Sequence, residues 1–277
     1  MTSAIKDRTT APTALGRRPS WQLRARAFGA MFRRDFTVTG KELPFVLAQV
    51  LLQPIFFMFI FGRLLTSIGF TAGTYASLLF PGLLALTVVV TAIQGTAFPL
   101  VVEFGYTREI DDRLLAPSPV WALAVEKILF AAARGLLAGL ALFPVGIWVL
   151  GSIPYQASGL VLLVTMLLLA CLVGATFGLV LGTFITPDQI NIFFSLLFTP
   201  LAFLGSVQYP WPQLAQLRWF QILTAFNPIT YASEGMRAAL IPGVPHMPAL
   251  VCVSVLLAGI VLFGILGLVG FRRRAAD

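Results

Sequence analysis

Six long runs of apolar residues constrain the fold of this chain more than any other feature of its sequence. A helix needs about 20 apolar residues to cross the roughly 30 Å hydrocarbon core of a membrane. None of the runs alternates apolar and polar residues with the two-residue period of a transmembrane β-barrel. The sequence therefore predicts an all-α integral membrane protein with six transmembrane helices, at residues 44–65, 78–102, 127–150, 159–183, 190–207 and 249–270.

Charged residues are few and lie mainly at the two ends of the chain. Of the 277 residues only 11% are charged, whereas about a quarter of a soluble domain is charged. Residues 1–43 hold nine Lys and Arg residues and three acidic ones, while residues 44–270 hold seven of each. The net charge of +8 therefore arises entirely from the segments at the two ends of the chain. A nucleic-acid-binding protein needs cations clustered on its folded surface, so no nucleic-acid partner is predicted.

The basic residues between the runs predict the orientation of the chain. Lys and Arg are enriched in the cytoplasmic segments of membrane proteins. They are frequent before the first run, at Arg108 and Arg113 between the second and third runs, and at residues 272–274 after the last run. The loop 151–158 has none. Both termini are therefore predicted to be cytoplasmic, with 271–277 as a basic tail.

The segment before the first run divides into two parts. Residues 1–20 are small, polar and interrupted by proline, which predicts a disordered cytoplasmic tail. Within residues 21–43 the apolar side chains recur at helical spacing, with most arginines off their stripe. This pattern predicts an amphipathic helix in the plane of the membrane surface; the alternative is a basic flank that only orients the first span. The apolar stripe consists of Trp21, Ala25, Phe28, Phe32 and Phe36.

The most charged internal stretch is residues 103–120, between the second and third runs. Its apolar edge and the proline that follows predict a helix of about two turns outside the membrane, ended before Pro117. Such a helix is suited to dock on a soluble partner; the alternative is an ordinary solvated loop. The charged face that would dock consists of Arg108, Asp111, Asp112 and Arg113.

The segment 208–248 is too long and too apolar for a plain loop. Asn227 followed by Pro228 has the pattern of an N-cap and first helical residue, and Pro242-Gly243 ends the predicted helix. Glu234 and Arg237, three residues apart, can pair on its polar face. We expect an outer amphipathic helix that dips into or rests on the membrane, or else a surface helix covering the bundle. Its candidate residues are Asn227, Pro228, Tyr231, Glu234 and Arg237.

Aromatic and small residues inside the runs give further candidates. Phe57, Phe61, Phe194 and Phe198 could line a passage through the membrane, although lipid contact or core packing is favoured. Ladders of glycine permit close helix approach, within one chain or between two. They lie at Gly174, Gly178 and Gly182 in the fourth run, and at Gly135 and Gly139 in the third.

Catalytic chemistry is not predicted. The chain has one histidine, His246, with no acid or cysteine close in sequence, and its two cysteines lie in apolar runs. No cluster indicates a metal site, and no phosphate-binding loop of the form GxxxxGK[ST] occurs. The sequence therefore predicts no catalytic residue, no metal and no cofactor bound by this chain.

Four stretches of the sequence resemble one family of transport proteins. The chain is similar to the membrane subunits of ABC exporters of the type 2 permease family, in the branch of the daunorubicin-resistance and nodulation-type permeases. The similarity extends from about residue 21 to 270. The matching stretches are QPIFFMFIFGRLL, YASLLFPGLLAL, EFGYTREIDDRLLAPSPVWALAVEKIL and NPITYASEGMR.

This resemblance implies a function. Residues 103–120 would include the coupling helix that inserts into a cleft of a separate cytoplasmic ATPase, and residues 21–43 would be the connecting helix near that ATPase. The family's pattern for the coupling segment falls on Glu103, Arg108, Glu109, Arg113, Leu114 and Leu115. The family often has a glycine where this chain has Ile110-Asp111-Asp112, which affects the detailed docking contacts. Two permease subunits, identical or different, would work with two ATPase subunits that bind ATP and magnesium.

The resemblance also implies a plasma-membrane location in a bacterium. A passage without charged rings favours a hydrophobic or amphiphilic substrate (a drug, a lipid or a glycan-linked molecule), while related exporters also move polysaccharides. An ion-coupled secondary transporter is the alternative. It would place acids at the middle of its spans, near broken helices. The mid-depth parts of all runs but the third contain no acid, so the ATP-driven exporter is favoured.

Overall fold

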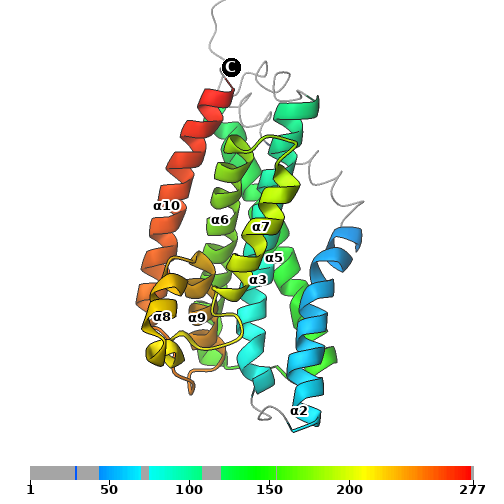
Figure 1. Cartoon of the computed structure of the whole chain (residues 1–277), viewed down its shortest axis with the longest axis vertical. Helices are drawn as coiled ribbons and strands as arrows, with labels where there is room; N and C mark the ends of the chain where they lie inside the picture. Colours follow the sequence, from blue (N-terminus) through cyan, green and yellow to red (C-terminus); the bar gives the residue numbers. More distant parts are fainter. Residues whose placement is uncertain (1–28, 30–43, 70–74, 108–119, 154, 276–277) are drawn as a thin grey trace, which may run out of the picture.

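The computed structural model describes residues 29, 44–69, 75–107, 120–153 and 155–275 as a bundle of helices (Figure 1). No strand occurs in this part of the chain. The predicted tail 1–20, nearly all of the predicted interfacial helix 21–43 and residues 108–119 of the predicted docking helix lie outside the described residues.

Among the described residues, five helices are long and apolar enough to cross a membrane. The first, Pro44–Ser67, contains a π-helical part, η1 (Met58–Leu64), and ends in α2 (Leu65–Ser67). The second consists of α3 (Tyr75–Val102), which continues into the π-helical η2 (Glu103–Thr107). The other three are α5 (Val120–Leu150), α6 (Leu160–Phe184) and α10 (Ala249–Arg274).

The run 190–207 forms a helix shorter than predicted, α7 (Ile190–Phe203). Its 14 residues extend about 21 Å, which is less than the hydrocarbon core. The chain leaves the helix at Leu204 to Ser206, where Ser206 has a positive φ of 50°. Side chains from α9 (Pro228–Leu240) bind the carbonyl groups at this end, so the last turn is satisfied without further helix.

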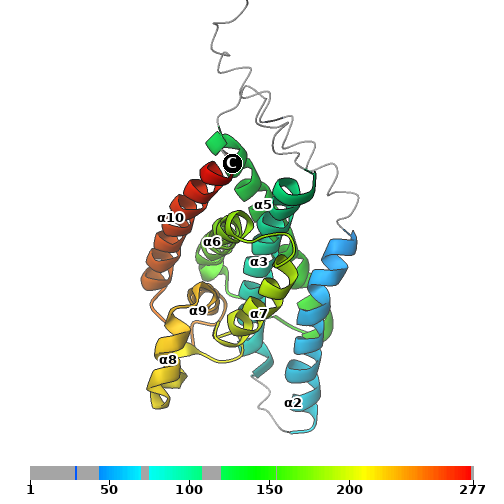
Figure 2. The same ribbon diagram turned by 45° about the horizontal axis from the view of Figure 1, so that its top comes forward.

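The central helix of the bundle is α3. In two views the row runs from α10 through α6 and α3 to the helix Pro44–Ser67, with α5 packed on α3 and α6 (Figures 1 and 2). An almost continuous series of α3 side chains is buried, from Leu79 to Ala97. A helix that is apolar on all sides is expected in the interior. By contrast, α10 keeps most of its apolar side chains exposed, as a lipid-facing helix would.

The glycine ladders pack helices of the same chain against α3. A Cβ atom at Gly178 would lie 2.5 Å from the Ile93 carbonyl oxygen, and one at Gly174 would lie 2.6 Å from that of Val89. On α5, a Cβ atom at Gly135 would lie 2.8 Å from the Val88 carbonyl oxygen. These glycines therefore let α6 and α5 approach the α3 backbone.

The two ends of the bundle differ. At one end, here called the Arg274 end, α10 finishes close to η2 and the α6–α7 connection (Figure 1). At the other, the α9 end, lie α9 and the short elements η3 (Ala157–Gly159), η4 (Trp211–Gln216) and α8 (Arg218–Ala225).

Replacing Gly178 with alanine should destabilise the protein by about 1–3 kcal/mol, because the new methyl group would overlap the α3 backbone. Gly264 in α10 is the matched control, since a Cβ atom there meets nothing closer than 3.9 Å and alanine favours a helix by up to about 1 kcal/mol. Thermal unfolding of the two variants in detergent measures the difference. A Gly178→Ala protein as stable as Gly264→Ala would contradict the close packing.

Candidate functional site

Asn227 begins α9 and ties it to α7. Its Oδ1 atom accepts a hydrogen bond from the Ile229 amide at 3.0 Å, while its Nδ2 atom donates to the Leu201 carbonyl at 2.9 Å. Pro228 occupies the first helical position, where no amide hydrogen is needed. Tyr231 donates to the Ala225 carbonyl at 2.8 Å. The helix starts where the sequence predicts it.

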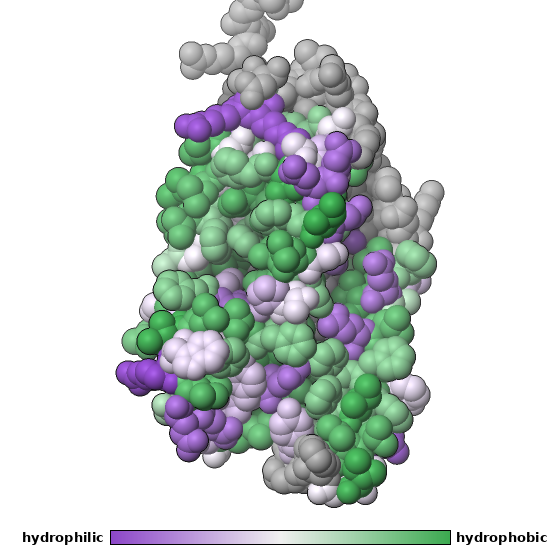
Figure 3. Space-filling view, viewed as in Figure 1, coloured by the Kyte–Doolittle hydropathy of each residue, from purple (hydrophilic) through white to green (hydrophobic). Residues whose placement is uncertain are grey.

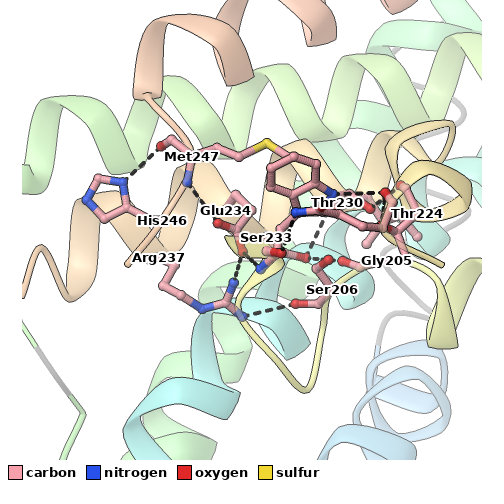
Figure 4. Close-up of polar contacts among 12 residues, drawn as sticks. Gly205, Ser206, Thr224, Thr230, Ser233, Glu234, Arg237, His246 and Met247 are labelled. Atoms are coloured by element: carbon pink, nitrogen blue, oxygen red, sulfur yellow. Dashed lines mark hydrogen bonds and ion pairs between the residues drawn. The ribbon is translucent and has the colours of Figure 1, made fainter. Parts of the chain in front are cut away.

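The prediction that Glu234 and Arg237 form an exposed polar face of α9 is wrong, because neither side chain has exposed surface. The two side chains do pair, but inside the protein (Figure 4). Small neighbours on the same helix, among them Gly235, let other helices approach; a Cβ atom there would lie 2.3 Å from the Met166 sulfur. The helix α9 is therefore packed against α3, α6 and α10.

The Glu234–Arg237 pair holds three loops together. Glu234 accepts hydrogen bonds from the Trp211 amide through Oε1 and from the Met247 amide through Oε2, each at 2.9 Å. Arg237 donates to the Ser206 carbonyl at 3.0 Å (Figure 4). Burial lowers the pKa of the Arg237 guanidinium and the Glu234 carboxylate opposes this effect; arginine keeps its charge in proteins.

The helix that exposes an apolar face at this end is α8. Its polar side chains Gln221 and Thr224 point inward, and Gln221 exchanges hydrogen bonds with Trp211. Its outward face is strongly apolar, with Phe226 83% exposed just beyond its end. This inverted pattern fits a helix in contact with lipid. The exposed residues Trp219, Ile222, Leu223 and Phe226 recur at i, i+3, i+4 and i+7, a signal that the sequence analysis missed.

Apolar residues cover much of the face in Figure 3. Hydrophilic residues lie where α10 finishes, and others lie in the middle of this face and near α8. Of the residues predicted to dock on a partner, only Glu103 is described. It lies in a buried ion pair, with its Oε1 atom 2.7 Å from Lys127 Nζ.

The short helix η2 is held by three other elements at the Arg274 end. Lys127 of α5 pairs with Glu103, as above. The Phe104 ring packs edge-on against Phe271 of α10, with ring centres 5.4 Å apart, and the Arg274 guanidinium lies 4.9 Å from the Phe104 ring centre. A Cβ atom at Gly105 would lie 2.0 Å from Cγ of Pro187 in the α6–α7 connection.

Arg274 also caps α6. Its Nη1 atom donates to the carbonyl groups of Gly182, Thr183 and Ile185 at 3.0 to 3.1 Å. A cation is favourable at this position because the last carbonyl groups of a helix carry partial negative charge. Arg272 and Arg273 are exposed. Only one of the three terminal arginines therefore has this structural role among the described contacts.

A cavity of about 410 Å³ lies between the helix Pro44–Ser67, α3 and α7. Phe194 and Phe198 line it, as suggested from the sequence, whereas Phe57 and Phe61 lie outside the lining and stack on each other with ring centres 5.5 Å apart. Polar residues that the sequence analysis did not assign to a passage face the same space: Gln49, Gln53, Thr87, Thr91, Gln94 and Ser195. Thr87, Thr91 and Gln94 recur at i, i+4 and i+7, which could have identified this face.

The described residues contain no group of three or more His, Cys, Asp or Glu side chains placed to hold a metal ion. What the arrangement offers is a neutral, partly polar cavity inside the bundle and a charged, tightly held assembly at the Arg274 end.

Comparisons with known proteins agree with this arrangement. Residues 26–241 match the family described as ABC-2 type transporter. The chain is 30% identical over 224 residues to the "Inner membrane transport permease YadH" of Escherichia coli K12, covering 78% of this chain and 84% of the relative. The same values hold for the YadH proteins of Escherichia coli O157:H7 and Shigella flexneri.

Replacing Glu234 with glutamine should destabilise the protein by about 3–5 kcal/mol, because the buried Arg237 charge loses its counter-charge. Replacing both residues with glutamine should cost less than the sum of the single changes. Arg218→Gln is the matched control, because Arg218 is exposed on α8. Unfolding in a denaturing detergent measures these energies; strictly additive effects would contradict the coupling.

Replacing Arg274 with alanine should destabilise the Arg274 end by about 1–3 kcal/mol, because three charge-assisted hydrogen bonds are lost. Arg273→Ala removes the same charge from the same tail and should have little effect. Hydrogen exchange of residues 103–107 and 182–187 in the purified protein locates the change. Equal protection of these segments in both variants would show that Arg274 does not hold them.

Proposed function

The chain belongs to the ABC-2 type transporter family, and on that premise we propose that this multi-pass plasma-membrane permease forms the passage of an ABC exporter. A separate cytoplasmic ATPase, present in two copies, binds ATP and magnesium and supplies the energy. The chain itself then carries no catalytic residue. The Arg274 end faces the cytoplasm in this proposal, in keeping with the basic residues at both ends of the chain.

The observation that carries the proposal is a continuous set of contacts from η2 to the cavity. Residues 108–120, which would dock on the ATPase, directly follow η2. Gly105 of η2 packs on Pro187, and α7 begins three residues later at Ile190. One turn further along α7, Phe194 and Ser195 line the cavity. A push on residues 108–120 can therefore move α7 relative to α3 and change the cavity.

The direction of transport is part of the same proposal. Closure of the ATPases would displace the helix Pro44–Ser67, α3 and α7 of the two permease halves relative to each other. Substrate would leave toward the α9 end, past α8 and α9. The second permease subunit, identical or different, would cover the exposed apolar side of α7, where Ile192 and Leu196 are more than 70% exposed.

The residues that line the cavity favour an ATP-driven exporter over an ion-coupled transporter. Such a carrier would need a carboxylate near the cavity to bind its proton or sodium ion. None of the described residues that line the cavity is acidic or basic. The energy is therefore better supplied from the end of the bundle, where the charged residues lie.

Charge reversal in the predicted docking helix tests the proposal. The triple variant Glu109→Lys/Asp111→Lys/Asp112→Lys should still insert into the membrane, but it should lose the ATPase on co-purification and lose transport-linked ATP hydrolysis in proteoliposomes. Asp7→Lys/Asp277→Lys is the control, because it reverses charges in the two terminal tails. Unchanged coupling in the triple variant would contradict the assignment of these residues.

A further inference from the structure

We propose that the cavity between Pro44–Ser67, α3 and α7 binds the uncharged head group of an amphiphilic substrate, one that carries several hydroxyl or amide groups. This inference rests on the proposed function and names the chemistry of its substrate. Three glutamine side chains and two phenylalanine rings line one cavity of about 410 Å³.

Three carboxamide groups converge on the cavity from two helices. Gln49 and Gln53 lie one turn apart on the first helix, and Gln94 faces them from α3. None of the three makes a hydrogen bond to another described residue. Gln49 is exposed, and Gln53 and Gln94 are partly buried, so all three amide groups are accessible to a molecule in the cavity. Together they offer such a molecule several hydrogen-bond donors and acceptors.

Other lining hydroxyl groups contribute mainly acceptor oxygens. Thr87 donates to the Leu83 carbonyl at 2.7 Å, Thr91 donates to the Thr87 carbonyl at 2.6 Å, and Ser195 donates to the Asn191 carbonyl at 2.9 Å. Their oxygen lone pairs remain available for donors of a bound molecule. The cavity therefore offers donors from the amides and acceptors from amides and hydroxyls.

The described lining residues are uncharged, which favours an uncharged head group. An anionic head group would need Arg, Lys or a helix N-terminus, and a cationic one would need a carboxylate. A carboxamide both donates and accepts hydrogen bonds, as do sugar hydroxyl groups and peptide amides. The lining thus matches a neutral head group of either kind and leaves a charged one without compensation.

The opposite wall fits the apolar part of the same molecule. Phe194 and Phe198 of α7 and Leu86 and Val90 of α3 face the cavity. The volume lies within the range of about 300–1,000 Å³ of small-molecule sites, which suits a head group rather than a whole lipid. Its acyl chain would leave between the first helix and α7 toward the membrane.

The position of the amides suggests where the head group enters. Gln49 is five residues from the start of the first helix, and Gln94 is eight residues before the end of α3. Both therefore lie in the half of the bundle nearer the Arg274 end. A substrate taken from the cytoplasmic leaflet would meet these groups first, before it moves toward the α9 end.

Binding to the purified full-length permease in nanodiscs, without ATPase, tests the inference separately from energy coupling. The probes are four lipids with the same fluorescent acyl chain and different head groups: galactose, glycinamide, phosphate and trimethylammonium. We expect the galactosyl or the glycinamide lipid to bind at least tenfold more tightly than both charged lipids. The comparison of these two distinguishes a hydroxyl-rich head group from an amide-rich one.

Variants locate the binding. Gln53→Leu/Gln94→Leu should weaken binding of the preferred neutral lipid at least tenfold, whereas Gln213→Leu/Gln216→Leu, on exposed positions of η4, should leave it unchanged. Gln94→Glu should raise affinity for the trimethylammonium lipid. That gain cannot result from loss of folding, so it remains informative if the double variant is unstable.

The outcomes are distinguishable. Equal binding of neutral and charged lipids, no binding of either neutral lipid, or full binding by Gln53→Leu/Gln94→Leu would each overturn the substrate class, even with ATPase coupling intact. Selective binding that depends on Gln53 and Gln94, together with wild-type coupling in the charge-reversal triple variant, would support this site while contradicting the assignment of the docking helix.

Discussion

The structure depends on one constraint: in surroundings without water, the carbonyl groups at helix ends must find donors inside the protein. Side chains from other helices provide these donors. Arg274 of α10 donates hydrogen bonds to carbonyl groups at the end of α6. At the end of α7, Asn227 and Arg237 of α9 donate to carbonyl groups. The buried carboxylate of Glu234 accepts hydrogen bonds from the amide of Trp211, at the start of η4, and from the amide of Met247, just before α10. Each cap thus ties together elements that are distant in sequence.

These caps leave α7 as the element with fixed ends and a loosely packed middle. One end follows the Pro187 contact with η2, and the other is bound by α9. Between them, α7 touches α3 but leaves Ile192 and Leu196 exposed. A helix held in this way can tilt as a rigid rod when either end moves. The same helix forms a wall of the cavity, so in the proposed mechanism a displacement at η2 would reach the cavity through α7.

The sequence predicted the features that depend on local patterns, and missed those that depend on distant partners. Apolar runs and the Asn227-Pro228 pair located helices well, because length, hydropathy and capping are local. The Glu234–Arg237 pair was placed on an exposed face, since spacing alone cannot show that loops near Ser206, Trp211 and Met247 cover it. The partner of each glycine ladder was likewise undetermined. The apolar face of α8 follows the helical pattern i, i+3, i+4 and i+7 in the sequence, but this pattern extends over only about two turns.

The distribution of charge bears on where the proposed energy coupling and substrate binding would lie. Ionised groups near the middle of a membrane are costly, and the two described ion pairs lie at the Arg274 end, between Glu103 and Lys127, and in α9, between Glu234 and Arg237. Polar groups in the cavity are therefore amides and hydroxyls, which need no counter-charge. In the proposed exporter, the cavity would open through a mechanical change at the helix ends, which η2 and the contacts at the ends of α6 and α7 would transmit.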